Sequence, residues 1–192
     1  MNLILGAVQC CLAPTLAAAA APEGMTVRYD KDTGKAEVSR DGRCLLRYNF
    51  TTVAVADALK GKKYAEPRSD YVHPLFGPSG EELTIDFAKD HPHHRGVYWA
   101  WPEVYYKGQV KDLHALQGVF ARPSKLLSAT AEAGTATIRA ESLWKWDDTE
   151  PIVRETADIR VRDAGSGGYF VDFEFTFEPL VDGVSVARRG QK

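Results

Sequence analysis

Residues 169–178 read Tyr169-Phe170-Val171-Asp172-Phe173-Glu174-Phe175-Thr176-Phe177-Glu178, and their side chains alternate in character. Successive side chains of a β-strand point to opposite faces of the sheet, so every second residue shares a face. One face of this stretch is entirely apolar, and it consists of Tyr169, Val171, Phe173, Phe175 and Phe177. The pattern predicts a half-buried strand, and the apolar face of such a strand requires a second sheet to pack against.

The chain before this stretch divides into further segments of strand character. Those nearest to it are residues 118–121, 125–132, 135–146 and 152–162. Towards the N-terminus, residues 26–29, 36–39 and 44–48 are separated by turn signals, as in an antiparallel meander. Residues 53–63 are compatible with a short helix or an irregular loop. The sequence therefore predicts an all-β fold, an antiparallel β-sandwich of two packed sheets.

A long connection rich in proline and glycine, residues 64–90, leads into the run Asp90-His91-Pro92-His93-His94-Arg95-Gly96. We expect this run to lie on a long ordered loop, because proline and glycine favour turns over regular ladders. Pro92 biases the residue before it towards extended backbone, in which His91 and His93 share one face and His94 lies on the other. Loops of this kind often carry the functional site of a β scaffold.

The histidine run is open to three chemical interpretations. His91 and His93 could hold a divalent metal ion, with Asp90 as a third ligand or as the group that orients a ring. The same side chains could instead transfer protons or hydrogen-bond to a polar ligand. In the third interpretation they only tie a surface turn together through backbone carbonyls.

Residues on either side of the run extend the candidate site. His73 precedes Pro74, so its backbone is also biased towards extended geometry, and it could join His91 or His93 or else cap a turn. Trp99 and Trp101 share a face in extended backbone and could line a cleft or fill the core.

The stretch Asp70-Tyr71-Val72-His73-Pro74-Leu75-Phe76-Gly77-Pro78-Ser79-Gly80, followed by the histidine run, resembles the motif pair of the bacterial family labelled methane oxygenase PmoA. This is a family of secreted proteins of unknown function. Residues 152–156 are similar to the family's strand around a glutamate, here Glu155. The resemblance covers the chain from Cys44 to Pro179 and implies a secreted β-sandwich. Members of that family are typically longer, so it also implies that a further segment follows Lys192.

Composition and charge exclude several classes of partner. The 192 residues are 44% hydrophobic and 26% charged, as in ordinary soluble proteins, with a formal net charge of -2. Without a basic excess, neither nucleic acid nor an anionic membrane is expected as a partner. The sequence contains no Gly-rich phosphate loop, G-x-S-x-G elbow, CxxC pair or H-E-x-x-H motif.

The N-terminal residues predict export. Residues 1–21 form an apolar, alanine-rich segment with small residues at Ala18, Ala20 and Ala21, as in a cleaved signal peptide. A membrane-spanning helix needs about 20 uninterrupted apolar residues, and Gln9 and Pro14 interrupt this segment. We therefore expect a periplasmic or secreted protein with one β-sandwich domain over residues 22–192. After cleavage Cys44 is the single remaining cysteine, which we expect to be a buried core thiol.

Three functions are compatible with these features. The first is a carbohydrate-active or carbohydrate-binding protein for a glycan or other small-molecule ligand; the second is a metal-dependent hydrolase or oxygenase; the third is a non-catalytic structural module. The cofactor is unknown, with a divalent metal as the candidate, bound by His91 and His93. We assign catalytic roles to His93, His94, Arg95 and Glu155. We assign ligand contacts to His73, Asp90, Trp99 and Trp101.

Overall fold

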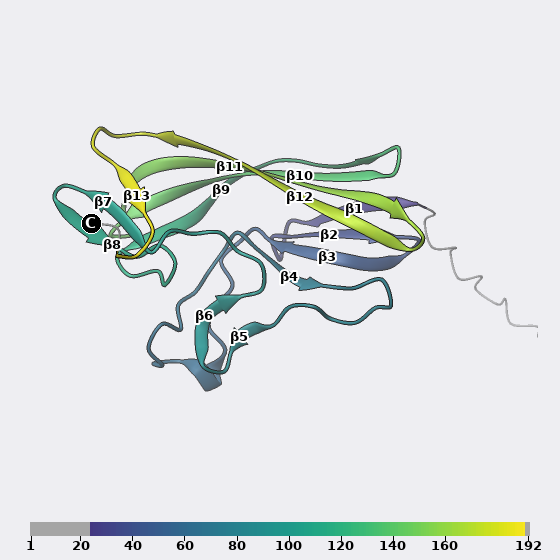
Figure 1. Cartoon of the computed structure of the whole chain (residues 1–192), viewed down its shortest axis with the longest axis horizontal. Coiled ribbons are helices and arrows are strands. Elements are labelled where there is room, and N and C mark those ends of the chain that lie inside the picture. Colours follow the sequence, from purple (N-terminus) through teal and green to yellow (C-terminus); the bar gives the residue numbers. More distant parts are fainter. Residues whose placement is uncertain (1–23, 191–192) are drawn as a thin grey trace, which may run out of the picture.

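The computed structural model describes residues 24–190, and most of them lie in antiparallel strands (Figure 1). The predicted signal peptide, residues 1–21, lies outside the described residues. The N-terminal segments form one sheet in the order β1-β2-β3-β4, with bounds β1 (Met25–Asp30), β2 (Lys35–Arg40), β3 (Arg43–Asn49) and β4 (Tyr71–Leu75). Each neighbouring pair is antiparallel, so the predicted meander is confirmed.

The second sheet contains the longest strands among residues 24–190 and follows the order β12-β11-β10-β9. Its strands are β9 (Val119–Glu132), β10 (Thr135–Trp146), β11 (Glu150–Gly165) and β12 (Gly168–Pro179). The two segments predicted at 118–121 and 125–132 are one strand, β9, in the structure. Pro123 cannot donate a ladder hydrogen bond. The register of β9 against β10 shifts before Ala140 and again after Glu141, close to the position where Pro123 pairs with Ser142.

The two sheets pack face to face, and the predicted sandwich follows from this contact (Figure 1). A single buried cluster combines side chains of both sheets. From the first sheet it includes Ala36, Val38, Leu45, Leu46 and Tyr48, and from the second Ala136, Ile138, Ala140, Ile159 and Val161. The apolar face of β12 lies at the margin of this cluster, where Val171 and Phe173 are partly buried.

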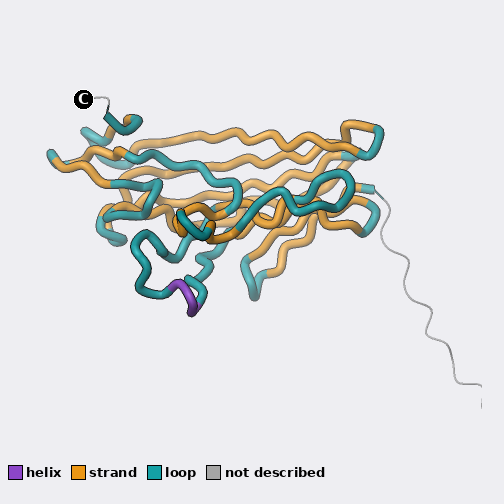
Figure 2. Tube along the Cα trace, turned by 60° about the horizontal axis from the view of Figure 1, so that its bottom comes forward, coloured by secondary structure: helices purple, strands orange, loops and turns teal. Residues whose placement is uncertain are grey.

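Besides the two sheets, the described residues form several short elements, which lie along one side and at one end of the sandwich (Figures 1 and 2). They are η1 (Asp57–Leu59), β5 (Asp86–Ala88), β6 (His91–Arg95), β7 (Glu103–Tyr106) and β8 (Gln109–Lys111), and β13 (Ser185–Ala187) pairs with β7. The short helix expected within residues 53–63 is the single turn η1. Among residues 24–190, no helix is long and apolar enough to cross a membrane.

The sequence predicts a loop for the histidine run, and this prediction is wrong. The run forms β6, which pairs with β5 in a two-stranded hairpin. A second buried cluster lies beside the hairpin at the end of the large sheet, and it joins Leu113 and Leu116 to Trp144 and Trp146. This cluster packs residues 113–116 against the sheet end.

Cys44 is partly buried at β3, and burial raises the pKa of its thiol to about 11. A thiol with such a pKa is protonated at neutral pH and is a poor nucleophile. Cys44 is therefore not the fully buried core thiol expected from the sequence, although its protonated state argues against a nucleophilic role.

The packing between the sheets can be tested with Ile138, whose side chain is 0% exposed in the shared core. Ile138→Ala should lower the free energy of unfolding by about 2–5 kcal/mol, because it removes buried methyl groups and leaves a cavity. Urea denaturation followed by circular dichroism measures the loss. Leu127→Ala on β9 is the control; Leu127 is 39% exposed, so the change should cost less than about 1 kcal/mol. Equal losses for the two variants would contradict the assigned core.

Candidate metal centre

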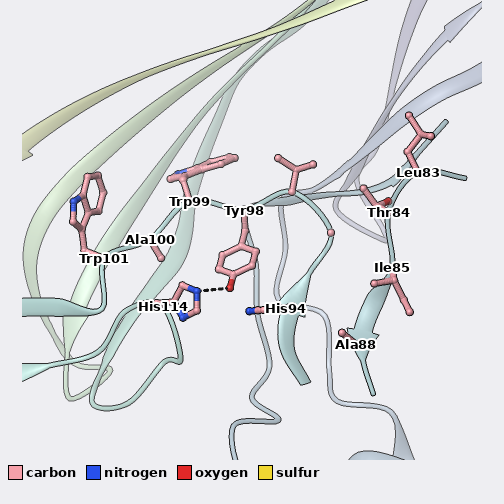
Figure 3. Close-up of a pocket in the computed structure, with 12 residues that line it drawn as sticks. Leu83, Thr84, Ile85, Ala88, His94, Tyr98, Trp99, Ala100, Trp101 and His114 are labelled. Carbon is pink, nitrogen blue, oxygen red and sulfur yellow. Dashed lines mark hydrogen bonds between the residues drawn. The ribbon is translucent and has the colours of Figure 1, made fainter. Parts of the chain in front are cut away.

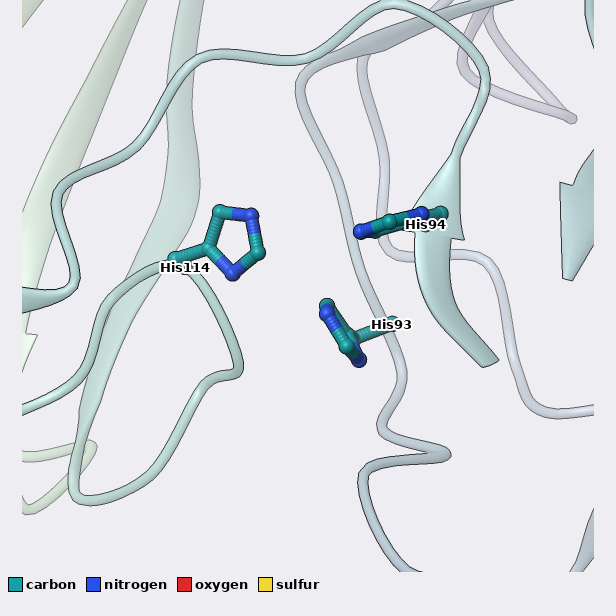
Figure 4. Close-up of side chains that lie close together, drawn as sticks. All are labelled: His93, His94 and His114. Atoms are coloured by element: carbon teal, nitrogen blue, oxygen red, sulfur yellow. The ribbon is translucent and has the colours of Figure 1, made fainter. Parts of the chain in front are cut away.

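Three histidines from two separate segments converge beside the sandwich (Figure 4). His93 and His94 come from β6, and His114 comes from the loop after β8. One ring nitrogen from each residue lies within 4.8 Å of the others. Two ligands of a tetrahedral zinc ion are about 3.4 Å apart, given bond lengths near 2.0–2.1 Å. Small side-chain rotations would therefore bring the three nitrogens to coordination distance.

The predicted alternation of faces along the histidine run is wrong. The ring centroids of His93 and His94 are 4.5 Å apart, so these neighbours do not diverge to opposite faces. The cause is the irregular hairpin: the β5–β6 register shifts between Asp86 and Ala88, and Phe87 has a φ of 57°. A ladder this short does not impose regular alternation. His91 stacks on His94 with ring centroids 4.9 Å apart, but it is not part of the set of three converging nitrogens.

His114 is held in place by a compact turn. Asp112 Oδ1 accepts the Ala115 backbone N–H at 2.8 Å, and the His114 backbone N–H donates to the Trp101 carbonyl at 3.1 Å. The buried Arg68 side chain donates to the His114 carbonyl. Sequence reasoning missed His114, because an isolated histidine 20 residues after His94 carries no spacing signal.

The Tyr98 hydroxyl lies 2.9 Å from His114 Nε2 and orients the ring by a hydrogen bond (Figure 3). The Arg68 guanidinium stacks over the Tyr98 ring, with its central carbon 4.3 Å from the ring centroid. Hydrogen bonds of this kind to the second ring nitrogen commonly orient histidine ligands in metal sites.

The surroundings of the three histidines lower their pKa values and so favour the neutral form of each ring. The pKa of His93 is lowered to about 4, mainly by burial and also by the nearby charges of His94, His114, His91 and Arg68. The pKa values of His94 and His114 are also lowered, with burial as the main cause in both. A neutral imidazole is the form that binds metal.

One buried atom of the cluster lacks a hydrogen-bond partner. His93 Nδ1 has no partner among the described residues, although it is shielded from solvent. A buried polar atom without a partner costs about 1–3 kcal/mol, so such atoms are rare in stable structures. The unpartnered nitrogen fits a site built to receive an additional group.

A pocket of about 740 Å³ opens against the cluster (Figure 3). Its lining includes His94 and His114 together with Tyr98, Trp99 and Trp101. Leu83 and Ile85, which are exposed, also line it. The two tryptophans assigned to ligand contacts from the sequence therefore share a pocket wall with two of the three converging histidines.

Arg95, to which the sequence assigned a catalytic role, is fully buried and does not line this pocket. Its guanidinium forms an ion pair with Asp86, with Nη2 3.1 Å from Oδ2, and it donates to the Tyr71 hydroxyl at 2.7 Å. The Phe87 ring covers it, with the guanidinium carbon 3.6 Å from the ring centroid. The structure places Arg95 as an anchor of the hairpin, because the buried guanidinium pairs with the partly buried Asp86 carboxylate and cannot contact a ligand in this arrangement.

Glu155 is likewise inside the protein, at 2% exposure, rather than at the pocket surface. It accepts hydrogen bonds from the indole N–H groups of Trp99 and Trp144, the latter at 2.7 Å. Burial raises its pKa, and the two indole hydrogen bonds oppose the increase. Glu155 thus fixes the orientation of Trp99, which is a member of the pocket wall.

The remaining predicted residues lie around the cluster without joining it. His73 Nδ1 hydrogen-bonds Thr84 Oγ1 at 3.0 Å, and His73 Nε2 lies 3.6 Å from a Glu82 oxygen, so His73 ties loop residues together. Asp90 occupies the exposed turn between β5 and β6. His91 is exposed and lines a second pocket of about 520 Å³ with His93.

Comparison with known proteins identifies one family. The model of a family described as "Family of unknown function (DUF6807)" matches residues 35–190. No curated protein and no solved structure matches the chain. The match includes the whole second sheet, strands β2, β3 and β4 of the first sheet, and all three histidines of the candidate centre.

The structural role of Arg95 can be tested through its partner. Asp86→Ala should lower the free energy of unfolding by about 3–5 kcal/mol, because it leaves a buried guanidinium without its counter-charge. Asp163→Ala is the control, since Asp163 pairs with Arg40 at the surface and is 49% exposed. The control should lose no more than about 1 kcal/mol. Equal, small losses in denaturation experiments would show that the buried pair does not anchor the hairpin.

The low pKa of His93 predicts a pH dependence of stability in metal-free protein. An unfolded histidine takes up a proton near pH 6.5, whereas folded His93 does so near pH 4. Between these values the unfolded chain binds more protons, so the free energy of unfolding falls as pH falls from 6.5 to 4. His93→Asn should reduce that fall, as measured by urea denaturation at pH 7 and pH 4.5. A pKa near 6.5 for His93 in proton NMR titration would refute the prediction.

Proposed function

We propose that this chain, which belongs to the DUF6807 family of unknown function, is an exported metal-dependent enzyme with a three-histidine centre formed by His93, His94 and His114. The observation that carries the proposal is the convergence of three imidazole nitrogens within 4.8 Å. Depressed pKa values keep these rings neutral, and His93 Nδ1 lacks a partner among the described residues. Three protein ligands leave at least one coordination position for water or substrate, which is the arrangement of catalytic rather than structural sites.

Imidazole ligands suit zinc, copper, iron and nickel, so the donor set restricts the metal to this group. Such a metal would supply an activated water for hydrolysis or a binding position for dioxygen. The second option corresponds to the label of the methane oxygenase PmoA family, and the accessible pocket beside the histidines is compatible with both options. In either case Tyr98 would hold His114, and Glu155 would hold Trp99 in the pocket wall.

The pocket favours a carbohydrate as the ligand. Trp99, Trp101 and Tyr98 line it beside two of the histidines. Aromatic rings pack against the C–H faces of sugars, and the histidines would contact hydroxyl groups. The two aliphatic side chains on the wall, Leu83 and Ile85, extend the apolar surface available to such a ligand.

Export to the periplasm or the medium is part of the proposal. It rests on the signal-like character of residues 1–21 and on the resemblance to a family of secreted proteins. Extracellular glycans are accessible to a protein in these compartments.

Metal analysis tests the centre directly. Purified protein equilibrated with Zn²⁺, Cu²⁺ or Fe²⁺ and then desalted should retain one equivalent of one of these metals by elemental analysis. His93→Ala, His94→Ala and His114→Ala should each weaken binding by at least about 100-fold, because loss of a ligand exceeds the 10–100-fold effect of losing an outer hydrogen-bond partner.

His91→Ala and His73→Ala are the matched controls, because both histidines lie outside the converging set. Both variants should retain the metal with wild-type affinity. Loss of metal in His91→Ala with retention in His114→Ala would support the His91–His93 pair predicted from the sequence. Absence of stoichiometric metal in the wild type would overturn the enzyme proposal and favour a non-catalytic module.

A further inference from the structure

The candidate centre lies between two pockets of different character. His94 and His114 belong to the lining of both the 740 Å³ pocket and the 520 Å³ pocket. The larger pocket is walled by tryptophan and aliphatic side chains, whereas Arg189, Asp112 and Tyr64 line the smaller one. A ligand bound across the histidines therefore has one end in an apolar pocket and the other in a polar, charged pocket.

The charges at the smaller pocket favour an anion. Asp112 pairs with Arg189, with Arg189 Nη2 2.7 Å from Asp112 Oδ2, so this pair is close to neutral. Arg68 lies behind His114, and its hydrogen bonds within the described residues go to the carbonyl oxygens of Leu113 and His114, not to a carboxylate. Its positive charge is therefore not held in an ion pair there, and the nearby Asp70 and Asp112 carboxylates offset it only in part. Histidine ligands are neutral, so a divalent cation at the centre would add to the positive potential.

Arg189 is the group best placed to receive the anion. Its side chain is 72% exposed and lines the pocket, while Asp112 fixes its position. A guanidinium carries five N–H donors in a planar fork, and the hydrogen bond to Asp112 Oδ2 uses one of them. The remaining donors suit two-point binding of a carboxylate.

We propose that the smaller pocket is an anion subsite and that the ligand is an acidic saccharide, whose carboxylate binds Arg189 while its sugar ring packs in the aromatic pocket. This assignment rests on the proposed function, because it places the ligand across the three-histidine centre. It extends that function by distinguishing uronic acid sugars from neutral sugars as the ligand class.

Calorimetric titration with a matched pair of probes tests the subsite. The probes are digalacturonic acid and its methyl ester, which differ chiefly in the charge of the carboxyl groups. Wild-type protein loaded with Zn²⁺ should bind the acid at least about tenfold more tightly than the ester, the difference expected for one hydrogen bond between charged groups. Arg189→Gln should weaken binding of the acid by at least about tenfold and binding of the ester by less, so that the preference for the acid falls.

Arg162→Gln is the control variant. Arg162 is exposed on β11 and pairs with Asp172 there, so the variant has the same change of net charge outside the linings of both pockets. It should retain the wild-type preference for the acid. Circular dichroism melting should show that Arg189→Gln remains folded, since the side chain is mostly exposed.

The outcomes separate this inference from the proposed function when the metal content of every sample is measured. Stoichiometric metal without a preference for the acid, an undiminished preference in Arg189→Gln, or no binding of either probe would overturn the subsite alone. A preference that depends on Arg189 in protein that binds no metal would support the subsite and overturn the metal centre.

Discussion

The buried ion pair between Arg95 and Asp86 is the interaction on which the candidate site depends. β5 and β6 are only a few residues long, so their ladder alone is too weak to fix a hairpin. Arg95 directly follows His94 in the sequence and is fully buried. Its guanidinium connects β6 to β5 through Asp86 and to β4 through the Tyr71 hydroxyl. A charge buried in this way is tolerated because its carboxylate partner and hydrogen bonds offset desolvation. The hairpin that carries His93 and His94 is thereby attached to the rigid sandwich.

A second buried carboxylate connects the core to the pocket. Glu155 lies on β11 and accepts hydrogen bonds from Trp144 in the core and Trp99 in the pocket wall. Asp70 is also buried and accepts a hydrogen bond from Tyr48 at 2.9 Å, and burial with the nearby Glu155 charge raises the pKa of Asp70 to about 7. These buried polar groups orient aromatic side chains that packing alone would leave less defined.

The histidine cluster combines features that do not favour stability. Burial disfavours the charged rings, and His93 Nδ1 is shielded without a partner in the described part of the chain. A structure tolerates such local costs when the surrounding scaffold is stable, and they concentrate at functional sites. Here the scaffold is the shared core of two sheets, and the site is built on short elements attached to its side. An aromatic pocket and a charged pocket share two of the histidines, so a ligand bound there would meet apolar groups on one side and charged groups on the other.

The sequence by itself determined the all-β class, the N-terminal meander and most strand positions, because the alternation of side chains along residues such as 169–178 is a local property. It also located His93 and His94, since clustered histidines are visible without a structure. Only the tertiary structure brought His114 to them, because a contact between segments 20 residues apart depends on how each packs against the sheet. The tertiary structure also decided that Arg95 and Glu155 are buried anchors. A charged residue in a motif has the same appearance in sequence whether it faces a pocket or satisfies another group in the core, and burial arises only when distant strands meet.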